Sequence, residues 1–464
     1  MAVQLLEVPG AVSKSLSGRL GAKLDSRAVQ FFADYQQSHD NFLVDVDGNE
    51  FLDVYAQIAS NAVGYNNPTV VKASTSNEMA LALSNRPCLG VYPGAHLADN
   101  IDSIMRIAPR GHNMMFPAQS GSEANELAFK AAFFLYQLKK RGLGAEWTQD
   151  ELESCLRNEE PGSPKLSILS FKDSFHGRGF GSLSTTRSKP IHKLDVPAFD
   201  WPMARFPALQ YPLESNVDKN REEVESCLKE VDELMSTWRD PVAAIIVEPI
   251  QSEGGDNHAP ASFFQGLQDL TRKHGALLIV DEVQTGFGAT GSFWAHESWN
   301  LREPADLVTF GKKAQMAGYF FGDKTLKPDK AYRQFNTWMG DEARLIVCNA
   351  IIDEILEKDL VTKVSAVGNA LYNALEKLAQ SYPDRVRNLR GKGAGTYIAF
   401  DTDGAAALCN KMKLLGVNIG NCGKNTVRLR PMLIFEEKYI PRLIAALVNA
   451  FKLPDSVQPG FATF

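Results

Sequence analysis

The segment VAAIIVEPIQSEGGDNHAPASFFQGLQDLTRKHGALLIVDE, residues 242–282, contains two short apolar runs separated by a helical pattern. The runs 242–249 and 276–282 have the length and composition of buried strands. Between them, residues 262–275 carry apolar side chains at helical spacing, and Gly275 marks the end of the helix. A strand, a helix and a strand at this spacing predict two parallel strands joined by a right-handed crossover. We therefore expect an α/β fold.

The flanking sequence extends this pattern. Residues 165–171 and 306–312 are further strand candidates, and residues 41–57 predict a hairpin that turns at an Asp-Gly pair. Residues 147–165 are polar and acidic and contain proline and glycine, which predicts an excursion over the surface. From about residue 347 the pattern changes to helices and a few strands, and this change predicts a separate C-terminal lobe.

Composition limits the classes of protein to consider. The chain has 464 residues, of which 44% are hydrophobic and 22% charged, as in ordinary globular proteins. Its formal charge of −6 gives no reason to expect nucleic acid or an anionic membrane as a partner. No apolar run approaches the roughly 18 residues that span a bilayer. We expect a soluble protein whose partners are small molecules.

Cysteine and histidine usage argues against disulfide and metal chemistry. The six cysteines are scattered without a CxxC pair, and the eight histidines include no HExxH motif. This pattern indicates a reducing compartment and no metal site. Residues 1–27 lack a secretory core, and Lys14, Arg19 and Lys23 only weakly resemble a mitochondrial presequence. We expect a cytoplasmic location, with the mitochondrial matrix as the alternative.

Polar residues follow four of the predicted strands at the edge where ligands bind in an open α/β sheet. They are residues 175–178, Glu248 and Glu253, residues 281–284, and Lys312 and Lys313. A lysine that loses its proton can form a Schiff base with a carbonyl, and an aspartate can keep a pyridinium nitrogen protonated. Pyridoxal phosphate needs both groups, and this set therefore indicates that cofactor.

Two glycine-bearing motifs allow more than one interpretation. Ser120, Gly121 and Ser122 open a long helix whose N-terminal amides favour a phosphate, although SGSE is also a simple capping box. The sequence GFGATG, residues 286–291, matches the dinucleotide pattern G-x-G-x-x-G, with Asp306 near the distance of a ribose-binding acid. The acidic pair just before it, residues 281–282, would repel a pyrophosphate, so we expect no dinucleotide there.

Several long motifs resemble the class III (ω-amino-acid) aminotransferases of fold type I. They include NFLVDVDGNEFLDVYAQIAS (41–60), SGSEANELAFKAAF (120–133), VDEVQTGFGATGSFWAHE (280–297) and DLVTFGKKAQMAGYFF (306–321). The resemblance runs nearly end to end and is closest to members that act on 4-aminobutyrate, the fungal ones in particular. It implies a large pyridoxal phosphate-binding domain, residues 76–345, with a mostly parallel seven-stranded sheet. The small domain would combine the N-terminal residues 1–75 with the C-terminal residues 346–464.

The resemblance also implies roles for single residues. Three residues separate Lys313 from a small pair, as in the family, which identifies Lys313 as the Schiff-base lysine; Lys312 directly follows the glycine that usually precedes that lysine. Asp281 would pair with the pyridinium nitrogen, Gln284 would bind the ring hydroxyl and Phe175 would stack on the ring. The phosphate would be held by Gly121, by Ser122 and by Thr337 of the partner subunit. The last role implies a homodimer with a shared active site.

By the same resemblance, the reaction would move the amino group of 4-aminobutyrate to 2-oxoglutarate in a ping-pong cycle and give succinic semialdehyde and glutamate. Arg178 would bind the distal carboxylate of either substrate and Arg430 the α-carboxylate of glutamate. Glu253 would neutralise Arg430 when 4-aminobutyrate is bound, because an unpaired buried charge is costly.

The open alternatives are a β-alanine or ornithine aminotransferase, a mutase or decarboxylase of the same fold, and a non-catalytic protein. Ser120 and Glu123 stand where animal members carry iron–sulfur ligands, so we expect no cluster. Val63 replaces a larger aliphatic residue of the animal forms and implies a slightly wider substrate pocket.

Overall fold

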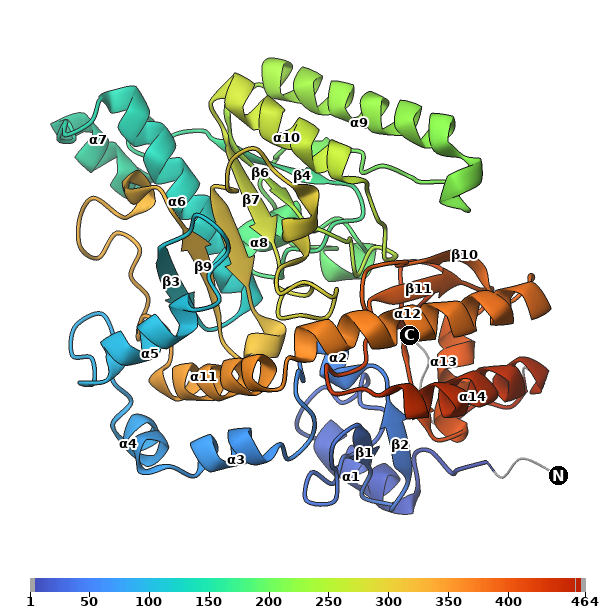
Figure 1. Ribbon diagram of the computed structural model, residues 1–464. Coiled ribbons are helices and arrows are strands. Elements are labelled where there is room, and N and C mark those ends of the chain that lie inside the picture. Colours follow the sequence, from blue (N-terminus) through green and yellow to red (C-terminus); the bar gives the residue numbers. More distant parts are fainter. Residues whose placement is uncertain (1–4, 455, 460–464) are drawn as a thin grey trace.

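The computed structural model describes residues 5–454 and 456–459 and has a seven-stranded sheet at its centre (Figure 1). The strand order is β3-β9-β8-β7-β6-β4-β5, and β9 alone runs antiparallel to its neighbours. The bounds are β3 Met114–Ala118, β4 Ser167–Phe171, β5 Met203–Ala204, β6 Val242–Val247, β7 Leu277–Asp281, β8 Leu307–Phe310 and β9 Ala317–Phe321. The predicted α/β fold with a mostly parallel seven-stranded sheet is confirmed.

The segment 242–282 folds as its pattern predicts. Strand β6, helix α10 (Ala261–His274) and strand β7 follow one another, and β6 pairs in parallel with β7. Gly275 ends the helix with a φ of 68°, a left-handed conformation that glycine adopts without strain. Every residue of β6 and β7 is buried, because helices cover both faces of this part of the sheet.

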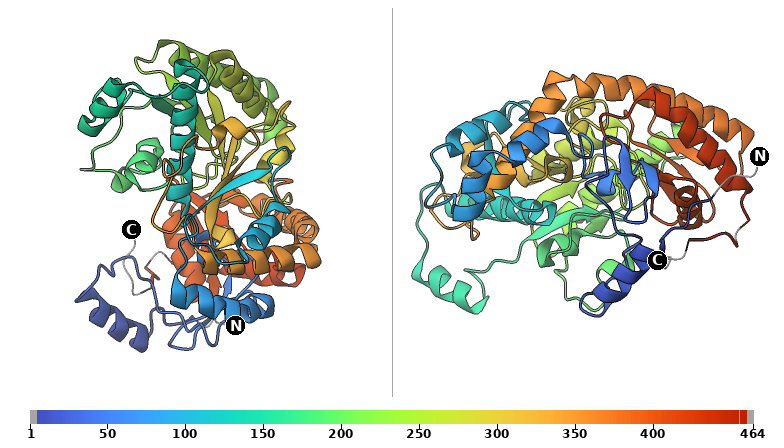
Figure 2. Two further views of the ribbon diagram at one scale, coloured as in Figure 1. Left: turned by 90° about the vertical axis from the view of Figure 1, so that its left-hand side faces the viewer. Right: turned by 90° about the horizontal axis from the view of Figure 1, so that it is seen from below.

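Alternate side chains of the central strands pack against different helices. Ile246 and Ile279 belong to one hydrophobic cluster with helix α6 (Gly121–Arg141). Ile245 and Leu278 belong to another cluster with α10 and with helix α9 (Val217–Thr237). Figures 1 and 2 show α6 on one side of the sheet and the α9–α10 pair on the other. The core is therefore two layers of side chains, one on each face of a single sheet.

Two smaller sheets lie beside the large one. The four-stranded sheet has the order β10-β11-β14-β13, and the three-stranded sheet has the order β1-β2-β12. Their bounds are β1 Phe42–Val44, β2 Glu50–Asp53, β10 Arg387–Arg390, β11 Ile398–Asp401, β12 Val417–Asn418, β13 Gly420–Cys422 and β14 Thr426–Leu429. Strands β1 and β2 form the predicted hairpin, and β2 pairs with β12 from the C-terminal part of the chain.

This pairing joins the two ends of the chain. The side-chain amide of Asn418 donates to Asp53 Oδ1 at 2.9 Å, across 365 positions of sequence. The sheets thus agree with a small domain formed from both ends, while the boundaries at residues 75/76 and 345/346 stay a prediction. Of the predicted N-terminal and C-terminal segments, residues 1–4, 455 and 460–464 lie outside the described part of the chain.

The structure adds detail to the expectations for residues 147–165 and 286–291. Residues 147–165 were expected to run over the surface, and they contain helix α7 (Gln149–Ser154), which begins with a capping box formed by Thr148 and Glu151. Such a short helix leaves too little periodicity to be found by pattern. After residues 286–291 the chain forms only the 3₁₀ turn Ala295–Trp299 before β8. The dinucleotide alternative requires a helix that begins at the glycines, and none begins there.

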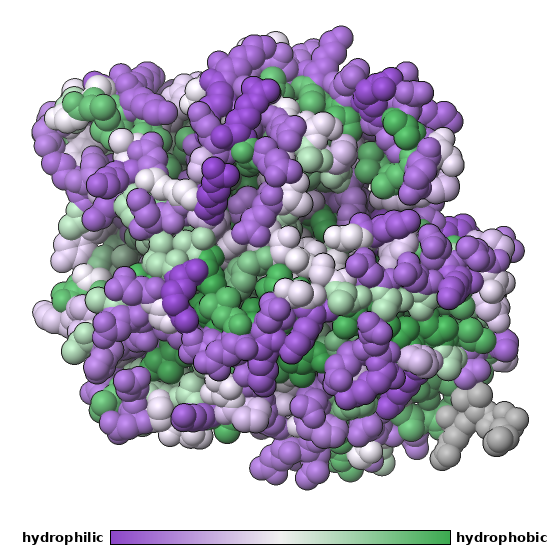
Figure 3. All heavy atoms as spheres, in the orientation of Figure 1, coloured by the Kyte–Doolittle hydropathy of each residue, from purple (hydrophilic) through white to green (hydrophobic). Residues whose placement is uncertain are grey.

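The other helices complete the outer layers. Their bounds are α1 Ala11–Gly21, α2 Ala56–Ala59, α3 Pro68–Ser74, α4 Asn77–Asn85, α5 Leu97–Met105, α8 Phe180–Thr185, α11 Glu342–Glu357, α12 Leu360–Ser381, α13 Ala405–Leu414 and α14 Ile440–Lys452. Among the helices of the described residues, none is both long enough and apolar enough to cross a membrane. Hydrophilic side chains cover much of the face in Figure 3, and hydrophobic ones gather across its middle.

Candidate active site

A cavity of about 190 Å³ opens beyond the carboxyl ends of β4, β6, β7 and β8. The predicted site residues that line it are Gly121, Ser122, Phe175, Glu253, Asp281 and Gln284. These residues come from four separate parts of the sequence and meet because parallel strands end at one edge. Lys312 lines the same cavity, whereas Lys313, Arg178, Arg430 and Thr337 are not among its lining residues.

Asp281 ends β7 and is buried, with both carboxylate oxygens hydrogen-bonded. Oδ2 accepts from Asn125 Nδ2 at 2.8 Å and lies 2.8 Å from His176 Nδ1. Oδ1 accepts from the backbone N–H of Val283 at 3.0 Å. These contacts fix the carboxylate at the wall of the cavity, where it can hold a positive charge.

The opposite part of the cavity is the N-terminus of α6, a helix of 21 residues. Ser120 caps the helix by accepting from the N–H of Glu123 at 3.3 Å. The side chain of Glu123 accepts from the N–H of Gln119, so the cap forms without the reciprocal bond of a capping box. Gly121 packs closely against the cavity wall, because a Cβ at this position would lie 2.6 Å from Val283 Cγ1. The free amides and the positive end of the helix dipole at Gly121 and Ser122 suit a phosphate.

Glu248 connects the ring-stacking residue to the substrate loop. Its Oε2 accepts from the N–H of Phe175 at 2.9 Å and its Oε1 from the N–H of Ser252 at 3.2 Å. Burial, reinforced by the nearby charge of Asp281, raises the pKa of Glu248 well above its usual range. The side chain therefore fixes two backbone positions of the cavity wall.

The adjacent lysines have different surroundings. Lys312 lines the cavity, and its Nζ donates to the carbonyl of Ile58 at 2.9 Å. Lys313 Nζ donates to the carbonyls of Gln284 and Gly286, the latter at 3.0 Å, and lines a different, smaller cavity beside Arg430. Residues 312–314 form a 3₁₀ turn in which Lys312 has a left-handed φ of 46°. Through the carbonyl of Gln284, Lys313 contacts a residue that lines the cavity, so both amines lie beside the predicted cofactor site.

Burial has made both amines easier to deprotonate. It lowers the pKa of Lys312 to about 8, assisted by the charge of Arg428. It lowers the pKa of Lys313 to about 7, assisted by the charge of Lys312. A lysine with a lowered pKa has more of the neutral form that attacks carbonyls and accepts protons. Lys313 has the lower pKa of the two and stays the predicted Schiff-base lysine.

The carbonyl that binds Lys312 belongs to a left-handed turn. Ala56, Gln57, Ile58 and Ala59 have φ values between 48° and 59°. Residues with a Cβ adopt this conformation at a cost of roughly 1–2 kcal/mol each. Such strain is typical of functional sites, and here it aims a carbonyl at the lysine of the cavity.

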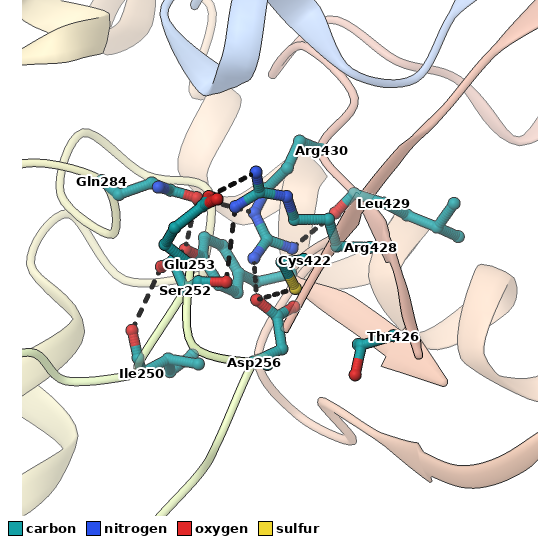
Figure 4. A network of polar contacts seen from close by, with 12 residues as sticks. Ile250, Ser252, Glu253, Asp256, Gln284, Cys422, Thr426, Arg428, Leu429 and Arg430 are labelled. Carbon is teal, nitrogen blue, oxygen red and sulfur yellow. Dashed lines mark hydrogen bonds and ion pairs between the residues drawn. The ribbon is translucent and has the colours of Figure 1, made fainter. Parts of the chain in front are cut away.

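The predicted ion pair between Glu253 and Arg430 is wrong, because Glu253 pairs with Arg428. Glu253 Oε2 lies 2.8 Å from Arg428 Nη2, and the guanidinium is 2% exposed (Figure 4). Arg428 lies within β14 and its side chain reaches the loop that follows β6, where Nη1 also donates to the carbonyl of Ser252 at 3.3 Å. Arg430 meets another acidic residue of the same loop, Asp256, and the sequence motif VRLRP contains both arginines.

Arg430 lies just beyond the end of β14 and has a different carboxylate partner. Its Nη2 binds Asp256 Oδ1, and its Nε donates to Gln284 Oε1 at 3.3 Å. Its guanidinium stacks on Tyr397, 3.3 Å from the ring centroid. Arg430 therefore orients Gln284 from the side of the small sheet and is already neutralised by a buried aspartate.

The remaining predicted residues lie near the cavity or apart from it. Arg178 is exposed, with its guanidinium 5.4 Å from the Phe175 ring and Nη2 3.5 Å from His192 Nε2. It is thus beside the ring-stacking residue, as a substrate-binding role requires. Thr337 is exposed, and its carbonyl accepts a hydrogen bond from Cys88 Sγ at 3.5 Å. Its predicted role belongs to a second subunit, and a single chain does not test it.

The residues present fit pyridoxal phosphate at each point of contact. The helix N-terminus at Gly121 suits the phosphate, Asp281 suits the pyridinium nitrogen, and Phe175 supplies a ring for stacking. Lys313, whose Nζ contacts the carbonyl of Gln284 at the cavity wall, supplies an amine with a lowered pKa. All three recognition elements and the amine therefore occur around one space.

Sequence reasoning gave no role to several residues that hold this site together. They are Asn125, His176, Glu248, Asp256, Tyr397 and Arg428. His176 and Glu248 were named only among the polar residues that follow predicted strands. Asn125 lies inside the motif SGSEANELAFKAAF and Arg428 inside VRLRP. Asp256 and Tyr397 contact the site only through the fold.

Comparison with known proteins gives a consistent set of relatives. Residues 24–451 match the family model described as aminotransferase class-III. The 4-aminobutyrate aminotransferase of Emericella nidulans is 54% identical over 96% of this chain and 90% of its own length. That of Saccharomyces cerevisiae is 51% identical over 97% of this chain and 96% of its own, and the mitochondrial enzyme of Mus musculus is 46% identical over 93% and 87%. A lysine aminotransferase from M. tuberculosis, solved in the internal aldimine form, superposes with a TM-score of 0.82 at 27% identity, covering 94% of this chain and 98% of that one.

Proposed function

Since the chain belongs to the class III aminotransferases, which use pyridoxal phosphate, we propose that it moves the amino group of 4-aminobutyrate to 2-oxoglutarate and gives succinic semialdehyde and glutamate. The observation that carries this choice of substrates is the buried ion pair of Glu253 with Arg428. When the substrate has one carboxylate, the closed ion pair leaves this part of the site neutral. When the substrate has two carboxylates, the pair can open and free the arginine to bind the second one.

Different residues of the cavity bind different parts of the cofactor. The N-terminus of α6 holds the phosphate, Asp281 keeps the ring nitrogen protonated and Phe175 packs on the ring face. Gln284 is oriented for the ring hydroxyl by Tyr397 and Arg430, which both donate to its Oε1. When bound, pyridoxal phosphate supplies an aldehyde for the substrate amine and a ring that withdraws electrons from the adjacent carbon.

We assign the cofactor-anchoring role to Lys313. Its Nζ contacts the carbonyl of Gln284, which lines the cofactor cavity, and its pKa of about 7 favours the neutral amine. Once the substrate amine has displaced it, Lys313 Nζ takes the proton from the substrate carbon and returns it to the cofactor side. Lys312, which donates to the carbonyl of Ile58, supplies a charge that helps to lower the pKa of Lys313.

Substrate binding uses two arginines at different distances from the ring. Arg178, beside Phe175, binds the distal carboxylate of either substrate. Arg428 receives the α-carboxylate of glutamate or 2-oxoglutarate, for which Glu253 has to move away. With 4-aminobutyrate, which has no carboxylate at that end, Glu253 stays on Arg428 and neutralises it.

A second copy of the chain completes the site in this proposal. Thr337, exposed here, would reach the phosphate of the partner subunit, so the active unit would be a homodimer. The cytoplasmic location expected from the N-terminal sequence stays a prediction, since the mouse relative is named mitochondrial.

The test is a comparison of amino donors. Purified protein with pyridoxal phosphate and 2-oxoglutarate is offered 4-aminobutyrate, β-alanine, ornithine and lysine in parallel, and glutamate formation is followed. The proposal expects 4-aminobutyrate to give the highest kcat/KM. A preference for one of the other donors would leave the assignment as an aminotransferase in place and change the assigned substrate. No glutamate from any donor would overturn the proposed reaction.

A further inference from the structure

Glu253 has a second cationic partner besides Arg428. Lys189, just before the 3₁₀ turn Pro190–His192, places its Nζ 2.7 Å from Glu253 Oε1. The two oxygens of one carboxylate therefore bind two different cations, Oε1 binding Lys189 and Oε2 binding Arg428. The three side chains are 32%, 19% and 2% exposed in the order Lys189, Glu253, Arg428. The carboxylate thus lies between a cation near solvent and a cation in the interior.

Arg428 can exchange Glu253 for another carboxylate at moderate cost. It donates to Tyr55 Oη at 3.1 Å and to the carbonyl of Ser252 at 3.3 Å, and both contacts are independent of Glu253. Its Nε is buried and has no hydrogen-bond partner among the described residues. The arginine therefore stays anchored and keeps donor capacity when Glu253 leaves.

Glu253 cannot leave Arg428 as easily, because an ionised carboxylate at this depth needs a counter-charge. Arg428 and Lys189 both lower the pKa of Glu253, against burial, which raises it. While Glu253 is bound to Arg428, the contact with Lys189 is one of its two cationic contacts. After Glu253 is displaced from Arg428, the contact with Lys189 is its main remaining cationic contact and stabilises the carboxylate more.

We propose that Lys189 is a positioning residue that holds Glu253 in the displaced state, and so allows Arg428 to bind the α-carboxylate of a dicarboxylate substrate. This inference rests on the proposed function, because it assigns that carboxylate to Arg428. Lys189 then acts on one class of substrate only. A substrate with a single carboxylate leaves Glu253 on Arg428 and does not need Lys189.

The experiment measures binding of two unreactive ligands to the holoenzyme by calorimetry. Glutarate represents the dicarboxylate and butyrate the monocarboxylate of 4-aminobutyrate. Lys189→Met should weaken glutarate about 10-fold or more and change butyrate less than about 2-fold, since only glutarate requires Glu253 to move. Lys189→Gln, which retains a donor without charge, should behave like Lys189→Met, and Lys189→Arg should restore most of the affinity for glutarate.

A double substitution separates positioning from direct contact. In Glu253→Gln the side chain is neutral and needs no counter-charge, so adding Lys189→Met should no longer weaken glutarate. Equal weakening of both ligands by Lys189→Met, or the same loss in the Glu253→Gln background, would overturn the proposal. Turnover of 4-aminobutyrate is measured separately: its absence would refute the proposed function, while the glutarate comparison still decides the role of Lys189.

Discussion

The cofactor end of the site and its substrate end are built in different ways. Asp281 lies at the end of a central strand, and three donors from the same part of the fold fix its carboxylate. Glu253 and Arg428 come from a loop of the large sheet and from a strand of the four-stranded sheet. Glu253 also binds Lys189 through its other oxygen, so its carboxylate has two cationic partners. The first region can hold one arrangement, and the second has an alternative partner that allows its carboxylate to move.

The largest expected effect separates the two lysines at the cofactor end. Lys313→Met should lower kcat by at least about 10⁴-fold, because it removes the anchoring amine and the proton carrier together. Lys312→Met is the matched control and should stay within about 10-fold, although it leaves the carbonyl of Ile58 without this partner and should lower stability by about 1–3 kcal/mol. Steady-state rates and thermal unfolding measure the two effects. An inactive Lys312→Met beside an active Lys313→Met would move the role to Lys312.

The next effect tests the fixed carboxylate. Asp281→Asn should lower kcat by about 10²–10³-fold for every amino donor, because the amide no longer stabilises a positive ring nitrogen. Asp269→Asn is the control, since that exposed aspartate only pairs with Arg302 at the surface. Rates with several donors check the prediction. A loss confined to one donor would show that Asp281 acts on the substrate and would remove the contrast between the two ends.

A smaller and selective effect is expected at the substrate end. Glu253→Gln should slow the half-reaction with 4-aminobutyrate by about 10- to 100-fold, because Arg428 is left buried without a counter-charge. The half-reaction with glutamate should change less than about 5-fold, since its own carboxylate neutralises Arg428. Single-turnover absorbance changes of the cofactor measure each half-reaction. Glu303→Gln, at an exposed pair with Arg272, is the control, and equal losses in both half-reactions would refute selective action.

The smallest effect is a pH shift that connects the two ends. Burial, with the charges of Lys312 and Arg430, lowers the pKa of Lys313 to about 7, so its amine becomes neutral as the pH rises through 7. In apoprotein, borohydride trapping of pyridoxal phosphate should speed up with a midpoint near pH 7. Arg430→Gln removes one cause of the lowering and should move the midpoint to higher pH. An unmoved midpoint would mean that Arg430 and Lys313 are electrically independent.

The sequence predicted the sheet well because its central strands are buried on both faces and read as continuous apolar runs. Val242–Val247 and Leu277–Asp281 needed no tertiary information to be recognised. Helix α7 was missed because six residues show too little periodicity. At the site, Asp281 and Glu253 could be identified because each is the acidic residue of a specific motif.

The pair of arginines could not be resolved in that way. The two lysines could be distinguished, because the family spacing fixes the distance of Lys313 from the small pair Ala317–Gly318. Arg428 and Arg430 stand two positions apart, and the end of β14 between them changes which acidic residue each one meets. For the arginines the motif limits the candidates to a pair, and the packing of a loop from elsewhere in the chain selects between them.

The pairing of β2 with β12 has a consequence for how the protein is made. Asp53 leaves the ribosome long before Asn418, its partner 365 residues later. At bacterial to eukaryotic elongation rates of roughly 5–20 residues per second, the N-terminal hairpin waits about 20–70 s for the strand that completes its sheet. The large sheet has all its strands by Phe321 and can assemble during that interval. The nascent chain therefore carries an unfinished sheet edge beside a formed domain until synthesis is almost complete, and in that period it depends most on protection from aggregation.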